Sequence, residues 1–95
     1  MRKYIVMDNG GPLQNCEFAV IFNETESHLK MAEALGGKDH VLGAGGFSVG
    51  IALRGEMAVS CYGKSVSLKK SSRGVEDAFT VALALFGTTD GIDIS

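Results

Sequence analysis

The sequence predicts a small α+β domain, in which a mostly antiparallel sheet in the order ββα-βββα carries two helices packed on one face. Short β-branched and aromatic segments alternate with glycine-containing turns, and two further segments repeat apolar residues at helical spacing. Hydrophobic residues make up 45% of the 95 residues, which suffices for one core but not for two. We therefore expect residues 1–87 to form a single domain and residues 88–95 to form a mobile tail.

Two strands open the chain. Residues 3–7 are β-branched and aromatic, and the glycines and proline of residues 8–12 predict a firm turn after them. Residues 17–22 are apolar nearly throughout, which predicts a second strand in the interior of the sheet.

The first helix is expected at residues 24–35. Asn23 can cap its N-terminus, and Glu26 follows three residues later at the spacing of a capping box. The glycine pair at 36–37 then supplies the left-handed conformation that ends helices.

The clearest strand signal is an alternation of apolar with small or polar residues over 47–53, which resumes over 57–62. The glycines of residues 41–46 predict a bent, irregular strand entry that permits a bulge or a close backbone approach. A three-residue loop at 54–56 keeps one face of this hairpin wholly apolar, with Gly55 taking a positive φ. The expected cross-strand pairs are Leu53 with Met57, Ile51 with Val59 and Val49 with Cys61.

The alternation changes phase after this hairpin. Apolar residues then fall at Val66 and Leu68, so a bulge or tight turn near Gly63 is needed to return them to the same face. We expect a further strand at residues 65–69.

The second helix is expected to start after Ser72, its predicted N-cap, and to end at Gly87. Thr80 is its one polar residue after position 77. A helix that is apolar nearly all round is buried on several sides or makes an oligomer contact.

Composition and charge exclude several classes of protein. A net charge of −2 argues against a strongly basic nucleic-acid binder. No apolar run approaches the roughly 20 residues of a membrane-spanning helix, and an acid at position 8 comes too early for a secretory signal. We therefore expect a cytoplasmic protein without a membrane partner.

No pattern in the sequence predicts a cofactor, a metal or a set of catalytic residues. Residues 58–65 resemble a phosphate-binding loop and residues 43–50 a dinucleotide loop, but strand alternation follows where phosphate binding needs a helix. Cys16, Cys61 and the two histidines are too scattered for a zinc site. A small thiol-dependent enzyme, in which His28 activates a cysteine, is the third functional alternative.

Positive charge is concentrated between residues 64 and 73, which hold four cations and no acid. An outward-facing strand there would add serine hydroxyl groups, and such an edge suits an anionic partner. A binder of nucleic acid or of an anionic ligand is therefore the second alternative. The residues of this basic edge are Lys64, Ser65, Ser67, Lys69, Lys70 and Arg73.

The face of the predicted hairpin opposite the core carries only small side chains. Another sheet or helix can approach such a flat surface closely. Together with the apolar second helix, this face predicts docking of a protein partner and a homodimer. The residues of this smooth sheet face are Ser48, Gly50, Ala52, Ala58 and Ser60.

The N-terminal strand and the stretch from Tyr62 to Leu68 resemble small single-domain proteins encoded by phage and prophage accessory genes. Proteins of that kind, anti-CRISPR proteins among them, often act by blocking a host macromolecule stoichiometrically. The resemblance implies an inhibitor without catalytic residues. The leading expectation is therefore a non-catalytic module that binds a protein partner.

Overall fold

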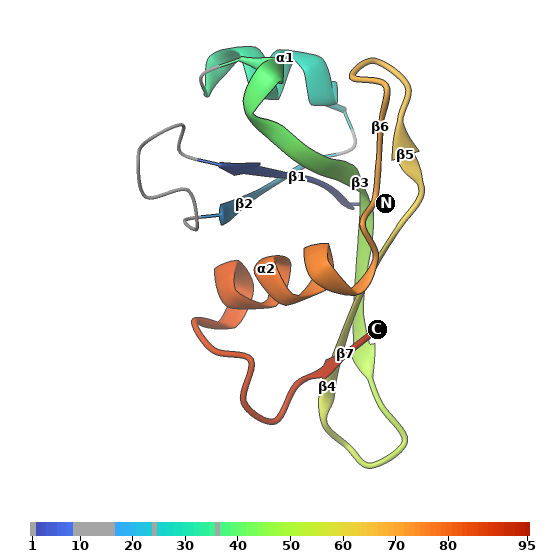
Figure 1. The fold of residues 1–95 in the computed structure, drawn as a ribbon. Helices are drawn as coiled ribbons and strands as arrows, with labels where there is room; N and C mark the ends of the chain where they lie inside the picture. The colour runs from blue at the N-terminus through green and yellow to red at the C-terminus, as the bar shows by residue number, and fades with distance from the viewer. Residues whose placement is uncertain (1, 9–16, 24, 36) are drawn as a thin grey trace.

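A five-stranded sheet in the order β2-β1-β3-β4-β7 forms the centre of the fold (Figure 1). The computed structural model describes residues 2–8, 17–23, 25–35 and 37–95. Neighbouring strands of this sheet are antiparallel, except that β4 and β7 are parallel. The elements are β1 (Arg2–Asp8), β2 (Glu17–Phe22), α1 (His28–Ala34), a 3-10 turn (Lys38–His40), β3 (Val41–Ile51), β4 (Met57–Tyr62), β5 (Lys64–Ser65), β6 (Lys70–Ser71), α2 (Val75–Phe86) and β7 (Asp93–Ile94).

The predicted α+β class, the mostly antiparallel sheet and the general order of elements are confirmed. Local hydrophobic periodicity carries this information, because each strand and helix must turn an apolar face toward the core. Most of the turn predicted at residues 8–12 lies outside the described residues, and Asp8 itself ends β1.

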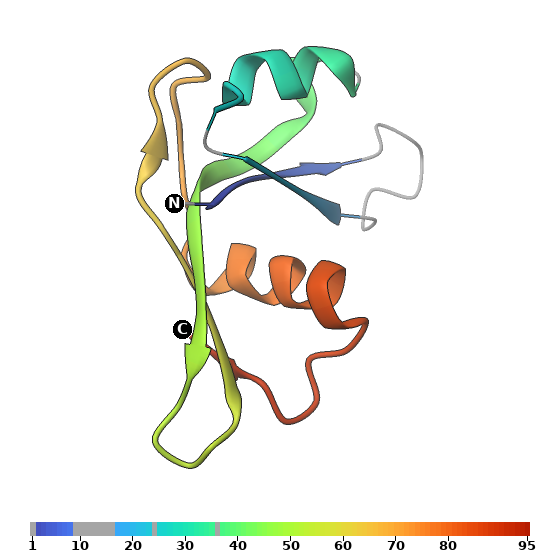
Figure 2. The same cartoon turned by 180° about the vertical axis from the view of Figure 1, so that it is seen from behind.

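The two helices lie on opposite faces of β1, so the prediction that both pack on one face is wrong (Figures 1 and 2). Tyr4 and Val6 pack with the buried residues of α2 in one core cluster. Ile5 and Met7 point the other way and pack with Ala32 of α1 in a second cluster. Four consecutive apolar residues give β1 two apolar faces, and each face needs a cover.

β2 lies at an edge of the described sheet, which corrects the prediction that it is an interior strand. Its apolar run has a different origin, because both of its faces contact a core cluster. Ala19 packs against the cluster that contains α2, whereas Val20 and Phe22 pack against the cluster that contains α1.

β3 includes the whole of residues 41–46, and the irregularity predicted there is present as a register shift in the pairing with β1, where Val6 lies opposite Gly43 and Met7 opposite Val41. They pair with β1, while the second half of β3 pairs with β4. The glycines allow a close approach here, since a Cβ at Gly43 would collide with the Asp77 carboxylate and one at Gly45 with the Tyr62 carbonyl. The expected close backbone approach is thus confirmed.

The β3–β4 hairpin has a five-residue loop at 52–56, so the predicted three-residue loop is wrong. The N–H of Ala52 donates to the carbonyl of Glu56 over 2.8 Å, and Gly55 takes the expected positive φ, +88°. The register differs by two residues from the predicted one, and therefore every side chain stays on its predicted face. The observed pairs are Phe47 with Cys61, Val49 with Val59 and Ile51 with Met57.

The strand predicted at residues 65–69 is instead a small hairpin formed by β5 and β6. The turn expected near Gly63 is present, with a φ of +78°. Within the hairpin, the N–H of Leu68 donates to Ser65 Oγ over 3.2 Å, a local bond that competes with strand pairing. The turn leaves Val66 80% exposed, so its predicted inward orientation is wrong.

α1 begins at His28 instead of at residue 24. Its N-cap is Ser27, whose Oγ accepts a hydrogen bond from the N–H of Lys30 over 3.1 Å. The predicted cap, Asn23, belongs to a preceding turn, in which its carbonyl accepts from the N–H of Glu26. A serine nearer the apolar stripe therefore replaces the asparagine as cap.

α2 ends at Phe86 as predicted, but it begins at Val75, later than a cap at Ser72 implies. Gly87 ends it in the left-handed conformation, at a φ of +73°, and donates its N–H to the carbonyl of Leu83. The predicted N-cap is wrong, because Gly74 occupies that position and Ser72 lies before it. Ser72 still binds the helix start, since its Oγ accepts from the N–H of Gly74 over 3.0 Å.

The final residues, which the sequence predicts as a mobile tail, include β7 and belong to the sheet. β7 pairs in parallel with β4, and the N–H of Ser95 donates to the carbonyl of Val59 over 3.0 Å. Ile92 and Ile94 pack against the core cluster that contains α2. A strand of two residues is too short to show a period in the sequence.

Candidate functional site

α2 presents an apolar stripe to solvent on the side away from the sheet. At 3.6 residues per turn, the members of this stripe fall within about 80° of the helix circumference. The described residues thus leave uncovered one side of a helix that is apolar nearly all round. The residues of the α2 stripe, with their exposed fractions, are Val75 (58%), Phe79 (48%), Leu83 (41%) and Phe86 (39%).

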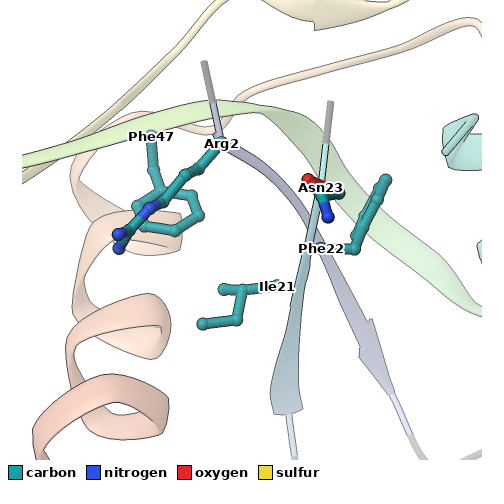
Figure 3. A pocket seen from close by; sticks show the side chains of 5 residues that line it. All are labelled: Arg2, Ile21, Phe22, Asn23 and Phe47. Atoms are coloured by element: carbon teal, nitrogen blue, oxygen red, sulfur yellow. The ribbon is translucent and has the colours of Figure 1, made fainter. Parts of the chain in front are cut away.

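A recess of about 250 Å³ lies at the end of β1 and β2 beside α2 (Figure 3). Ile21 and Phe47 form its apolar part, and Arg2 and Asn23 bring polar groups to it. The part of its lining that the structure describes has no carboxylate, thiol or imidazole to act as a general acid or base.

The smooth sheet face exists as predicted in position. Ser48 lies opposite Ser60 and Gly50 opposite Ala58, and Ala52 follows at the start of the loop. The two serine hydroxyls bind each other over 2.9 Å, which satisfies both groups without a partner molecule. The face carries no charged side chain at these positions, and its small residues alone do not define a ligand.

The predicted basic edge is only partly assembled. Lys64, Lys69 and Lys70 are exposed on the β5–β6 hairpin. Ser67 is also exposed, and its Oγ accepts from the N–H of Leu29 over 3.3 Å. Ser65 is only 2% exposed, which corrects the prediction that its hydroxyl faces outward.

Arg73 does not belong to the basic edge, because three acids surround its guanidinium. Its Nε donates to Asp77 Oδ1 over 2.7 Å. Its Nη1 donates to Glu17 over 3.2 Å and to Glu76 over 3.4 Å. The prediction of a free cation at this position is therefore wrong.

Asp77 is the centre of a buried polar network that the sequence analysis missed. Its side chain is fully buried and accepts from the N–H of Arg73 over 2.9 Å. The Tyr4 hydroxyl donates to Asp77 Oδ2 over 2.5 Å and lies 2.8 Å from Ser72 Oγ. Burial, reinforced by the hydrogen bond to Asp77, raises the pKa of the Tyr4 phenol far above its usual value. The available signal was the i,i+4 spacing of Arg73 and Asp77 at a helix start.

Cys61 is buried in the core cluster that contains α2. Burial raises the pKa of its thiol to about 12, so at neutral pH the thiol stays protonated and is a poor nucleophile. His28 packs on the α1 side of the sheet against Phe22, and the structure does not bring it to Cys61. Cys16 lies outside the described residues.

His28 is 7% exposed, and its Nε2–H donates to the carbonyl of Gly45 over 3.0 Å. Burial lowers the pKa of this imidazole, and the charge of Lys3 lowers it further. A histidine with a lowered pKa in the folded state takes up its proton first in the unfolded chain as the pH falls. Its contribution to stability is therefore complete above the unfolded pKa and is lost below it.

We expect the free energy of unfolding to decrease as the pH falls below about 6.5, the usual pKa of histidine. The H28Q variant keeps a side-chain N–H for the Gly45 carbonyl but does not titrate. Urea denaturation at a series of pH values should therefore give a smaller decrease for H28Q than for the natural sequence. Equal decreases in the two proteins would contradict the role of His28.

Within the described residues, no group of three His, Cys, Asp or Glu side chains is placed to hold a metal ion. Neither described helix has the length and apolar character needed to cross a membrane. The chain matches no protein-family model, no curated protein and no solved structure. A function must therefore be inferred from the surfaces and buried groups described above.

Proposed function

We propose that this protein is a non-catalytic interaction module whose contact surface is the α2 stripe, and that it assembles as a homodimer. The α2 stripe supports the proposal most directly, because two phenylalanines and a leucine stand 39–48% exposed on one helix face. Aromatic and large aliphatic side chains of this kind are enriched in the centres of protein interfaces. A module of this type acts by occupying its partner's surface stoichiometrically.

The spacing within α2 favours a second copy of the chain as the occupant. Large apolar residues follow one another at intervals of four, four and three, which reads nearly the same from either end. In an antiparallel pair of α2 helices, Phe79 of one copy contacts Leu83 of the other, and the two-fold symmetry produces the same contact a second time with the copies exchanged. Such a pair also keeps the two Glu76 carboxylates at opposite ends and opposes the helix dipoles.

Four of the described titratable groups are buried, and their burial supports a non-catalytic role. Asp77 and Tyr4 are held in a buried network, and Cys61 is buried with a raised pKa. His28 is 7% exposed and bound to a backbone carbonyl. A catalytic acid, base or nucleophile needs access to substrate, and these groups are used inside the fold.

Analytical ultracentrifugation tests the assembly at concentrations up to the high micromolar range. We expect the natural sequence to form dimers and F79D to sediment as a monomer, because a carboxylate at the centre of the stripe would be buried without a partner. L53D is the matched control, since Leu53 is fully exposed in the β3–β4 loop, away from α2. A monomeric natural sequence, or a dimeric F79D variant, would overturn the proposal.

A further inference from the structure

A second surface, separate from the α2 stripe, lies between α1 and the β5–β6 hairpin, which are neighbours in Figures 1 and 2. It is a pocket of about 310 Å³ at the lower end of the size range of small-ligand sites. Segments far apart in the sequence build it. The lining residues that matter here are Lys3, Ser27, His28, Gly46, Lys64 and Ser67.

The pocket is cationic, because Lys3 and Lys64 both line it and no Asp or Glu is among its described lining residues. Lys3 Nζ donates to the backbone carbonyl of Glu26 over 2.9 Å, which holds the ammonium in place and leaves two of its protons for a ligand. Ser27 and Ser67 add hydroxyl groups. This combination of ammonium and hydroxyl donors is the one that binds phosphate oxygens.

The sheet leaves room above Gly46 for a ligand. Gly46 lies opposite Lys3 of β1 on one side and opposite Tyr62 of β4 on the other. Directly opposed residues project to the same face of a sheet. On this face, Gly46 therefore leaves a position without a side chain between the Lys3 ammonium and the Tyr62 ring. Tyr62 is 41% exposed, so part of its side chain is open to solvent for stacking.

A second cationic pocket, of about 290 Å³, adjoins the first across the β5–β6 hairpin. Lys64 and Val66 line both pockets, and Lys69 and Lys70 complete the second. The described residues that line this pocket also include no acid. The surface therefore offers successive positions for negative charge, with Lys64 between them.

We propose that these two pockets bind consecutive phosphates of a single strand of nucleic acid, with a base stacked on Tyr62. Closely spaced ammonium groups beside an aromatic side chain are the elements that non-specific single-strand binders combine. The site differs from the predicted basic edge, because it excludes Arg73 and includes Lys3 from the first strand. It does not depend on the α2 stripe and holds whether or not the protein dimerises.

Fluorescence anisotropy with a labelled oligothymidylate tests the proposal. We expect binding to weaken at least about tenfold in the K64E variant and to decrease steeply with salt, because each phosphate contact releases counterions. R54E is the matched control, since Arg54 is exposed in the β3–β4 loop and the substitution changes the net charge equally. Affinity in R54E should stay within about twofold of the natural sequence.

Three further measurements separate this ligand from others of similar charge. Thymidine monophosphate should bind more weakly than the oligonucleotide, and polyglutamate should not compete with it. In an NMR titration with the oligonucleotide, the amide signals of Gly45, Gly46 and Ser67 should move most. Equal losses in K64E and R54E, displacement by polyglutamate, or equal affinity for the mononucleotide would overturn the proposal.

Discussion

Replacing Asp77 with asparagine should lower the free energy of unfolding by about 3 kcal/mol. The Asp77 carboxylate is fully buried and accepts hydrogen bonds from the Arg73 backbone, the Arg73 guanidinium and the Tyr4 hydroxyl. An asparagine presents an amide nitrogen to at least one of these donors and carries no charge to balance the guanidinium. Arg73 retains Glu17 and Glu76 as partners, which places the loss at the lower end of the range for a broken buried ion pair.

Urea denaturation measures this loss, and E76Q is the matched control. Glu76 lies on the same helix and binds the same guanidinium over 3.4 Å, but its side chain is 73% exposed. Exposed ion pairs contribute little, so E76Q should change the free energy of unfolding by less than about 0.5 kcal/mol. Similar losses in the two variants, or an unchanged stability of D77N, would contradict a central role for Asp77.

Sequence periodicity predicted the elements whose signal is local. The end of α2 at Gly87 is as predicted, because a long apolar run followed by glycine is typical of a helix that ends at that glycine. The faces of the β3–β4 hairpin are also as predicted. Its register is not, since registers that differ by two residues give every side chain the same face.

Features that depend on distant parts of the chain were not predictable from a single sequence. β7 has two residues, and its pairing with β4 is visible only once the sheet exists. α1 covers the second apolar face of β1; the four consecutive apolar residues of β1 indicate that this face exists, but not which segment covers it. The β5–β6 hairpin depends on Ser65, whose hydroxyl binds the backbone of its own turn.

For the candidate surfaces too, the sequence indicates the local pattern, and only the fold shows what is exposed. The sequence indicates that α2 is apolar all round, but only the sheet shows which side stays exposed. Arg73 and Lys64 look alike as cations in one basic stretch, whereas the fold pairs Arg73 with Asp77 and leaves Lys64 beside Lys3. A cluster of cations in a sequence therefore indicates a binding surface only once the cations that pair with acids inside the fold are known.

Replacing Gly45 with alanine should lower the free energy of unfolding by roughly 2 to 3 kcal/mol. Gly45 is buried in β3, and an added Cβ would collide with the Tyr62 carbonyl oxygen and lie 3.4 Å from the Ser72 Cβ. The carbonyl belongs to the backbone of β4 and cannot rotate aside as a flexible side chain can. The two strands must therefore separate, which also displaces the Gly45 carbonyl from His28.

G50A is the matched control, because Gly50 lies in the same strand and an added Cβ there meets no atom within 4 Å. We expect G50A to raise the free energy of unfolding by about 0.5 kcal/mol, since alanine loses less backbone entropy than glycine on folding. Urea denaturation of both variants separates steric collision from strand propensity. If G45A and G50A changed the free energy of unfolding in the same direction and by similar amounts, the strand propensity of alanine alone would explain both changes. The collision expected at Gly45 would then not contribute to stability.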